Sequence, residues 1–489
     1  MPINFPDSPA ENDSFTSGGK KWIFNGTVWT LVTANSYTIS TGEVTAAKIA
    51  SNAVTEAKIN AGAVTQSKLA SGLSGITVTT TANRSAVIPS PFTGQFIFLT
   101  DTSQLQRWDG SSWVVAITTA PTGAPTSVAV SGSPLSSTVT LTFSAGPDGG
   151  STITNYQYAL STNAGSTYGS YTALSPADGT SPITITGLSP GTAYLVKLKA
   201  VNALGVGSSE SSAVSFTTAG LSVEYLVVAG GGAGGGGEYN SGGGGAGGYV
   251  TSTQTVSAGS YTVTIGAGAT GSTGRGANGV NSSFSGSGLT TVTAVGGGGG
   301  GTHTGVQAGV AGGSGGGGSQ AGGAGGAGTA GQGNNGGGAW YAAGSGGGGA
   351  GAAGTAGPGG STAPTQAQIS GGIGLQSSIN GTSTYRAGGG GGGQRSAYNV
   401  PQGLGGNGGG GNGGTDPSNG FSATVNTGGG GGGSGGDNLT LRSGGSGGSG
   451  VCIVRYLTAD SSTTTGGTIT TSGAYTVHTF LASGSLVIA

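Results

Sequence analysis

YLVVAGGG at residues 225–232 opens the stretch that decides the fold, and GVCIVRY at residues 450–456 closes it. Between these apolar runs lie most of the chain's 115 glycines, in blocks that are each followed by a short segment of different composition. Because a glycine costs roughly 0.5–1 kcal/mol more to order than an alanine, the default interpretation is a flexible linker. Strand-like runs at 261–265 and 289–295 interrupt the blocks, however, and large side chains separate them. We therefore predict an ordered domain.

Two common glycine-rich structures do not fit this stretch. Collagen requires a strict Gly-X-Y period and abundant proline, whereas here the spacing is irregular and proline is sparse. A nucleotide-binding P-loop requires Gly-Lys-Ser or Gly-Lys-Thr after its glycines, and the stretch contains no lysine. The many G-x-G-x-x-G matches arise by chance in such a sequence.

The ordered structure that glycine permits is a bundle of polyproline-II-type helices, with three residues per turn and no internal hydrogen bonds. The backbone N–H and C=O groups must then bond to neighbouring helices, and only glycine lets backbones approach on every side. A block such as 428–433 would span about 19 Å. The loops that join the blocks would gather at the two ends of the bundle.

The framing motifs resemble the glycine-rich domains of bacteriophage tail fibres and adhesins. Besides the opening run, the matching motifs are GGYV at 247–250, YTVTIGAG at 261–268, TGGGGGG at 427–433 and GGSGV at 447–451. The resemblance covers residues 221 to about 456. The framing motifs match specifically, whereas the residues between them match only loosely. It implies a polyglycine-II core and receptor binding through the loops at one end of the bundle.

The composition excludes several classes of protein. The net charge is −1 and only 6% of the residues are charged, so the chain lacks the basic face of a nucleic-acid-binding protein. The single cysteine, Cys452, excludes a disulfide framework. His303 and His478 lie in different regions, and we expect neither a metal site nor a cofactor. We find no signal-peptide pattern at the N-terminus and no apolar run near the roughly 18 residues of a membrane span. Both findings fit the extracellular location on the virion that the resemblance implies.

The N-terminal part carries two copies of one small module. FNGTVW at residues 24–29 and WDGSSW at residues 108–113 share an aromatic residue, Asn or Asp, Gly and a closing Trp. Asn-Gly and Asp-Gly favour two-residue hairpin turns. We predict β-hairpin modules at 1–38 and 76–120, similar to modules in phage tail and baseplate proteins, with the first attached to the virion. The tryptophans either fill a minimal core or bind sugars.

A ten-residue repeat separates the modules. EVTAAKIASN, AVTEAKINAG and AVTQSKLASG follow one another over residues 43–72. One such unit is too short to bury its own apolar residues, so it needs neighbouring units or other chains. The repeat resembles those of phage fibre stems, which implies an intertwined homotrimer over 39–75. A partly ordered spacer is the alternative.

Residues 121–219 resemble a fibronectin type III domain. Short strand-like runs recur at regular spacing, and LSPGTAY at 188–194 matches the tyrosine corner of this sandwich, with Tyr194 as the corner residue. Phe143 stands where a tryptophan is usual. The glycine-rich domain is predicted at 220–457, and the remaining residues 458–489 are predicted to form a small β cap on it. The predicted fold class is an all-β multidomain fibre.

Enzyme activity is not expected, because the few carboxylates of the C-terminal half show no spacing suited to glycoside hydrolysis. The segments between the glycine blocks instead carry residue types that are enriched in binding hot spots. The candidate receptor-binding residues are Glu238, Tyr239, His303, Trp340, Tyr341, Tyr385, Arg386, Arg395 and Tyr398.

The resemblance implies two kinds of partner: a polysaccharide or outer-membrane protein on the host-cell surface, and other virion tail proteins contacted through the N-terminus. A structural head fibre or decoration protein without a receptor site is the main alternative. A cell-surface or ice-binding glycine-rich protein is a third possibility, which the irregular inserts disfavour.

Overall fold

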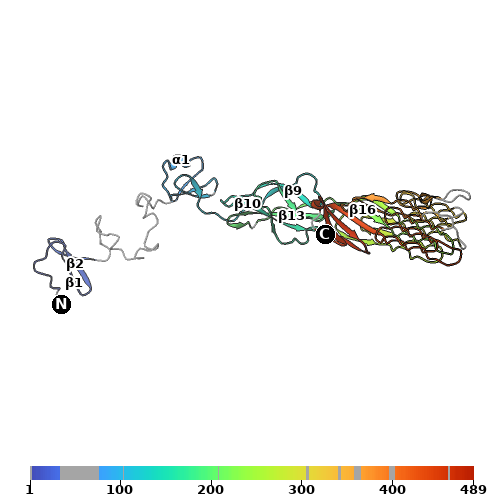
Figure 1. The fold of residues 1–489 in the computed structure, drawn as a ribbon. Helices are drawn as coiled ribbons and strands as arrows, with labels where there is room; N and C mark the ends of the chain where they lie inside the picture. The colour runs from blue at the N-terminus through green and yellow to red at the C-terminus, as the bar shows by residue number, and fades with distance from the viewer. Residues whose placement is uncertain are drawn as a thin grey trace. The chain divides into compact units, whose positions relative to one another are not determined.

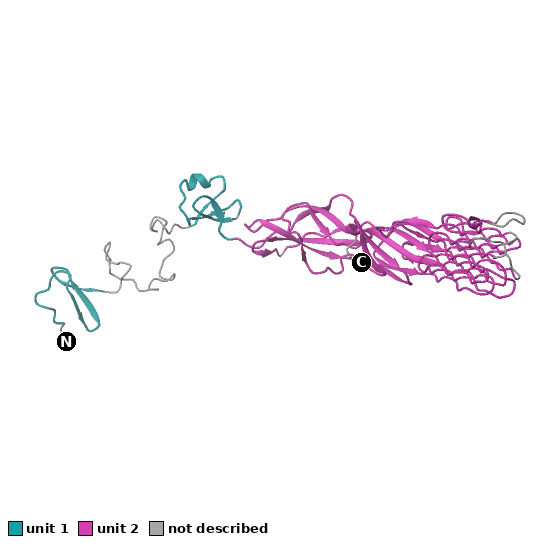
Figure 2. Cartoon of the chain, viewed as in Figure 1, with its two compact units in different colours: residues 1–117 teal, residues 118–489 magenta. Residues whose placement is uncertain are grey.

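The computed structural model describes residues 3–32, 76–102, 104–207, 209–303, 308–339, 343–356, 365–395, 402–460 and 463–489. The chain divides into two compact units, residues 1–117 and 118–489 (Figure 2). Strands dominate the described residues, which confirms the predicted all-β class. The predicted stem at 39–75 lies outside the described residues.

The first unit contains the two N-terminal modules. The first module is an antiparallel sheet of β1 (Ser14–Ser17), β2 (Lys20–Phe24) and β3 (Trp29–Val32). The second module combines a short helix with a four-stranded sheet, whose members are α1 (Arg84–Val87), β4 (Thr77–Thr79), β5 (Phe96–Leu99), β6 (Gln104–Trp108) and β7 (Trp113–Val115). The tryptophans pack on other aromatic rings, and the Trp108 and Trp113 ring centroids lie 5.6 Å apart.

Both modules turn in the same way, but not through the two-residue turns that the sequence predicts. The strands pair across four residues, 25–28 in the first module and 109–112 in the second. In each turn, Oδ1 of the first residue, Asn25 or Asp109, accepts hydrogen bonds from the amides two and three residues later. These bonds lower the pKa of Asp109 to about 2. The Asx side chain therefore selects the longer turn.

Residues 118–219 form a two-sheet sandwich. One sheet contains β8 (Thr126–Val130), β9 (Thr138–Ser144) and β12 (Ile183–Thr186). The other contains β10 (Ile153–Ser161), β11 (Thr172–Ala173), β13 (Ala193–Asn202), β14 (Gly205–Val206) and β15 (Val214–Thr217). Ser189 N donates to the Tyr194 hydroxyl at 3.0 Å, as expected for a tyrosine corner. Phe143 packs against Tyr156 in the core, with ring centroids 4.6 Å apart.

A second sandwich follows, made of two five-stranded sheets. The strands of the first sheet lie in the order β17 (Tyr249–Val256), β16 (Leu221–Val228), β23 (Val451–Leu457), β26 (Tyr475–Phe480) and β25 (Thr468–Ser472). The strands of the second sheet lie in the order β20 (Leu289–Ala294), β19 (Ser282–Gly286), β18 (Gly259–Thr264), β27 (Gly484–Ile488) and β24 (Thr464–Thr465). Fully buried side chains from both sheets, such as Tyr456 of the first and Phe284 of the second, form one core.

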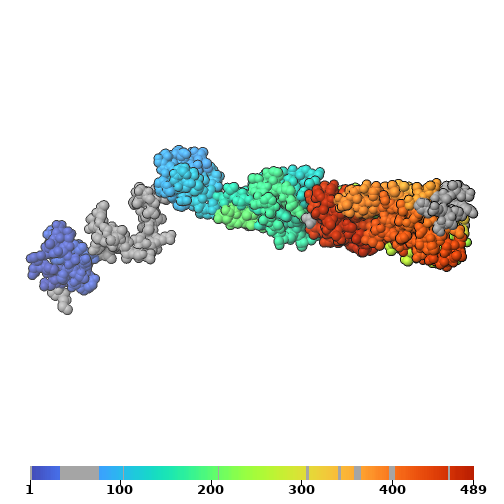
Figure 3. Space-filling model, in the orientation of Figure 1, coloured from blue at the N-terminus to red at the C-terminus, as the bar shows by residue number. Residues whose placement is uncertain are grey.

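The C-terminal residues, predicted as a separate cap, are therefore part of both sheets. β26 pairs with β23 and β27 pairs with β18, so the tail completes the sandwich that the framing runs begin. In Figure 3 these residues, in dark red, adjoin the orange glycine-rich segments. The short helix η6 (Thr458–Asp460) connects β23 to the tail.

The glycine blocks leave this sandwich as extended segments, here called rods, that run side by side (Figure 1). In the rod at 230–237, every third amide donates to the same neighbouring segment at 2.7–3.0 Å. Gly230, Ala233 and Gly236 donate to residues 274–280, Gly231, Gly234 and Gly237 to residues 442–448, and Gly232 and Gly235 to residues 242–245. A period of three with no bond inside the rod is the polyglycine-II arrangement, and the prediction is confirmed.

The carbonyl groups of the same rod accept hydrogen bonds from three further segments, namely 297–300, Ala269 and 431–434. Six segments thus surround the rod. Other rods repeat the pattern: Gly388, Gly391 and Gln394 donate to residues 408–414, while Gly390 and Gly393 donate to residues 241–244. The bundle (this set of rods) is therefore held by backbone hydrogen bonds in every lateral direction.

A hairpin and a short helix interrupt the rods. β21 (Leu375–Ser377) pairs with β22 (Thr384–Arg386), and Ile379, in the connection between them, packs on the outer face of β16 and β23. The 3-10 helix η4 (Gln366–Ile369) begins with a capping box between Thr365 and Gln368. The hairpin therefore lies at the sandwich end of the bundle.

Candidate binding surface at the loop end of the glycine bundle

The end of the bundle away from the sandwich, here called the loop end, is defined by how the rods connect. The rod at 230–237 leaves β16 and the rod at 242–248 returns to β17, so the turn between them lies at the far end. The turn at 437–442 lies beside it, because Gly237 and Arg442 exchange backbone hydrogen bonds. Gln320 N donates to Asn240 O, which places a third turn there.

The packing of the rods keeps large side chains out of the interior of the bundle. A Cβ atom added to Gly234 would lie 2.0 Å from the Gly432 carbonyl oxygen, and one added to Gly243 would lie 2.2 Å from Gly390 O. Real Cβ atoms do not approach backbone oxygens so closely. The interior of the bundle therefore accepts only glycine and an occasional Ala or Ser, such as the fully buried Ala246 and Ser434.

Tyr239 and His303, both sequence candidates, meet at the loop end. Their ring centroids lie 4.2 Å apart at an interplanar angle of 46°. The preceding residue, Thr302, donates its hydroxyl to Gly236 O at 2.6 Å, which fixes the turn against the rod. His303 Nδ1 is buried, and the described residues offer it no hydrogen-bond partner. Glu238, half-buried, lies next to this aromatic pair in the chain.

Arg395 joins the same surface through Asn438. With the Asn438 amide oxygen turned toward the guanidinium, both terminal nitrogens of Arg395 donate to it, at 2.8 and 3.1 Å. Asn438 N in turn donates to Glu238 O at 2.9 Å. The structure therefore brings Glu238, Tyr239, His303 and Arg395 together at one end of the bundle.

The turn at 437–442 supplies residues that are not among the sequence candidates. Asp437 Oδ1 accepts hydrogen bonds from the amides of Leu439 and Thr440, both at 2.8 Å, and these bonds lower the pKa of Asp437. Leu439 is 83% exposed and Leu441 is 56% exposed. A Leu-Thr-Leu run between two glycine blocks is the signal that could have identified them, since neither leucine fits inside the bundle.

Two sequence candidates lie elsewhere. Tyr385 and Arg386 belong to β22, at the sandwich end of the bundle. Arg386 is only 6% exposed, and burial lowers its pKa. Tyr385 is 40% exposed but cannot share a surface with the loop end. The remaining candidates, Trp340, Tyr341 and Tyr398, lie outside the described residues.

The surroundings of the buried titratable groups in the sandwich indicate a structural role for these groups. His478 donates through Nδ1 to Gly466 O at 2.7 Å, and its Nε2 lies 3.1 Å from Thr464 Oγ1. Burial lowers the pKa of His478, and burial raises the pKa of the Cys452 thiol to about 12. Within the described ranges, no group of three or more His, Cys, Asp or Glu side chains is arranged to hold a metal ion. The described helices include none that is long and apolar enough to cross a membrane.

Comparisons with solved structures match only part of the chain. Among solved structures, titin domains A168–A170 are 25% identical over 20% of this chain and 32% of that chain, with a TM-score of 0.18. The FN1–FN3 domains of chicken CNTN1 are 19% identical over 24% of this chain and 41% of that chain, with a TM-score of 0.18. The chain thus spans well under half of each structure. A search of curated proteins found no match.

Models of two protein families match the chain directly. The fibronectin type III domain model matches residues 123–217. The glycine-rich domain model matches residues 207–457, slightly more than half of the 489 residues. This chain belongs to the glycine-rich domain family and carries a fibronectin type III domain in front of its glycine-rich region.

Proposed function

We propose that this chain is a bacteriophage tail fibre or adhesin that binds a host-cell surface receptor through the loop end of its glycine bundle. One observation carries the proposal: the interior of the bundle excludes large side chains, while aromatic, charged and aliphatic side chains gather on the turns at one end. Tyr and Arg are enriched in binding hot spots. A surface so different from the rest of its domain is suited to recognition.

The rigidity of the bundle supports the same proposal. Each turn at the loop end begins and ends on rods whose amides are bonded in three lateral directions. The turns also bond to one another, through Gly237 with Arg442 and through Glu238 with Asn438. A surface ordered before binding loses little conformational entropy on binding, which favours affinity. Loops on a rigid scaffold can also change in sequence without loss of the fold.

The proposal assigns the N-terminal module to virion attachment, the repeats at 39–75 to a trimeric stem and the location to the outside of the virion. It includes no catalytic step and no cofactor. In this arrangement the receptor is a polysaccharide or a protein of the host surface.

The experiment is adsorption of the full-length chain to a panel of candidate host cells. A variant with Trp340, Tyr341, Arg395 and Tyr398 all changed to Ala should lose cell binding while its melting temperature is unchanged. Tyr385→Ala is the matched control, because it removes an exposed aromatic ring at the sandwich end of the bundle, away from Arg395. This control should bind as the wild-type chain does.

If the four-residue variant adsorbs as well as the wild-type chain, these residues are not part of the receptor site. A chain that assembles onto virions but adsorbs to no host cell would instead favour a head fibre or decoration protein without a receptor site.

A further inference from the structure

Strand β13 of the fibronectin type III domain presents a second surface, independent of the loop end. Tyr194, Val196 and Leu198 face the core, so Leu195, Lys197 and Lys199 lie on the opposite side of the strand. These are the only two lysines in residues 118–489. In a chain with 6% charged residues, two neighbouring lysines on one side of one strand form a distinct cationic site.

Two tyrosines from the loop after β10 cover these lysines. Lys197 Nζ lies 4.7 Å from the centroid of the Tyr168 ring, and Lys199 Nζ lies 4.5 Å from that of Tyr171. Both distances are within the roughly 6 Å of a cation–π contact. Each ammonium group is therefore held at a fixed place although its side chain is partly exposed.

One carboxylate faces the pair, and it neutralises only one lysine. Glu210 Oε1 lies 2.6 Å from Lys197 Nζ, and the Tyr171 hydroxyl donates to Glu210 Oε2 at 2.6 Å. The hydrogen bond from Lys197 is the main cause of the lowered pKa of Glu210. Lys199 makes no ion pair with any residue of the described ranges. The cluster therefore carries one positive charge without a carboxylate partner.

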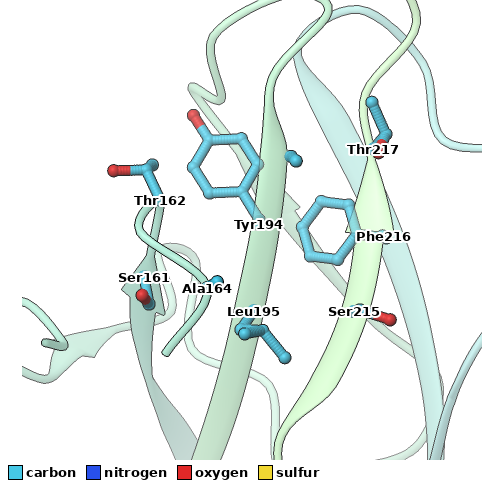
Figure 4. Close-up of a pocket in the computed structure, with 9 residues that line it drawn as sticks. Ser161, Thr162, Ala164, Tyr194, Leu195, Ser215, Phe216 and Thr217 are labelled. Carbon is cyan, nitrogen blue, oxygen red and sulfur yellow. The ribbon is translucent and has the colours of Figure 1, made fainter. Parts of the chain in front are cut away.

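A hollow of about 410 Å³ lies at the start of β13, the strand that also carries the two lysines. Thr162 lies on one side of it and Ser215 and Thr217 on the other, with Leu195 between them (Figure 4). The three hydroxyl-bearing residues are exposed. Leu195 precedes Lys197 by about 7 Å and Lys199 by about 13 Å along the same side of the strand, so an extended ligand can reach both the hollow and Lys199. The volume lies within the roughly 300–1,000 Å³ of small-molecule sites.

We infer that this surface binds an acidic oligosaccharide. The hydroxyl groups of Thr162, Ser215 and Thr217 match the hydroxyls of a sugar, and the Leu195 side chain matches the apolar face of a sugar ring. Lys199 pairs with a carboxylate of the saccharide through a charge-assisted hydrogen bond. A single unpaired cation suits one carboxylate and is too little charge for a nucleic acid, which needs several phosphate contacts.

The test is calorimetric titration of the full-length chain with defined hexasaccharides. The acidic probes are hyaluronate, oligogalacturonate and oligosialate, and chitohexaose is the neutral probe. At least one acidic probe should bind about tenfold more tightly than chitohexaose, and its affinity should fall as salt is raised. Lys199→Gln should weaken that binding about three- to tenfold, and Lys21→Gln, the same change in the first unit, should have no effect.

Glu210→Gln gives the sharper test, because it should act in the opposite direction. Loss of this carboxylate frees Lys197, so the acidic probe should bind about threefold more tightly. Ser215→Trp places an indole in the hollow and should prevent binding at an unchanged melting temperature.

Three results would overturn the inference: equal affinities for acidic and neutral probes, unchanged affinity in Lys199→Gln and Glu210→Gln, or no binding of any acidic probe at about 5 mM. Cell adsorption through the loop end is measured separately, so either proposal can fail while the other stands.

Discussion

Gly234→Ala tests whether the glycine bundle is packed as closely as its geometry implies. The added methyl carbon would lie 2.0 Å from the Gly432 carbonyl oxygen and 2.4 Å from its carbon. Ordinary van der Waals contact begins at 3.4 Å, so the rods at 230–237 and 428–436 would have to separate by about 1.4 Å (3.4 − 2.0) at this point.

The cost follows from the hydrogen bonds that join those two rods. Gly431 N donates to Gly232 O at 2.9 Å and Ser434 N donates to Gly235 O at 3.0 Å. A separation of this size would break both bonds and leave their buried groups without partners. A typical net hydrogen bond contributes about 1 kcal/mol, and each buried group left unsatisfied costs about 1–3 kcal/mol. At the low end of that range the four groups of the two broken bonds cost about 4 kcal/mol in total. We therefore expect a loss of about 3–5 kcal/mol, at or above the usual cost of overpacking.

Hydrogen exchange of the full-length chain, followed by mass spectrometry, measures this loss locally. Peptides from 230–248 should exchange roughly 100- to 5,000-fold faster in Gly234→Ala than in the wild type. Gly274→Ala is the matched control, because a Cβ there meets nothing within 4 Å and the residue does not have positive φ. It should leave protection unchanged or raise it slightly, since alanine reduces the entropy of the unfolded chain. Equal protection in both variants would refute the close packing of the rods.

Two further predictions concern buried groups of the C-terminal sandwich. Cys452 is fully buried, and its pKa is raised to about 12. A thiol reagent at about pH 8 should therefore label it only after denaturation. Stoichiometric labelling of the native chain would contradict its placement. His478 has a lowered pKa because of burial, so the unfolded chain binds its proton more readily, and stability should fall as the pH drops below about 6.5. Thermal melting at several pH values should show this decline in the wild type and less of it in His478→Gln, whereas equal pH dependence in both would exclude His478 as its source.

Much of the fold follows from local features of the sequence. The glycine blocks predict polyglycine-II rods, because no other residue allows a backbone to be surrounded by backbones. The LSPGTAY run predicts the tyrosine corner, whose hydrogen bond from Ser189 to Tyr194 is local. The turns follow less directly from the local sequence: Asn-Gly predicts a two-residue turn, but the Asx side chain bonds to nearby backbone amides and selects a four-residue turn.

The candidate surface was predicted only in part. Tyr239, His303 and Arg395 are recognisable as large side chains between glycine blocks, and the structure places them together. Arg386 has the same local signal, yet it is buried beside the sandwich because its segment forms a strand. Leu439 differs from its expectation in the opposite direction. An aliphatic side chain suggests burial, but this one is exposed at a turn.

The sequence by itself determined the conformation of each segment: strands at the framing runs, rods in the glycine blocks, and large side chains only outside the interior of the bundle. The tertiary structure alone decided which rods are neighbours, which turns share the loop end, and that β24 to β27 complete both sheets of the sandwich. The physical reason is that a glycine block offers the same N–H and C=O groups in every lateral direction. Nothing local distinguishes one partner from another, so the pairing depends on contacts between residues far apart in the chain.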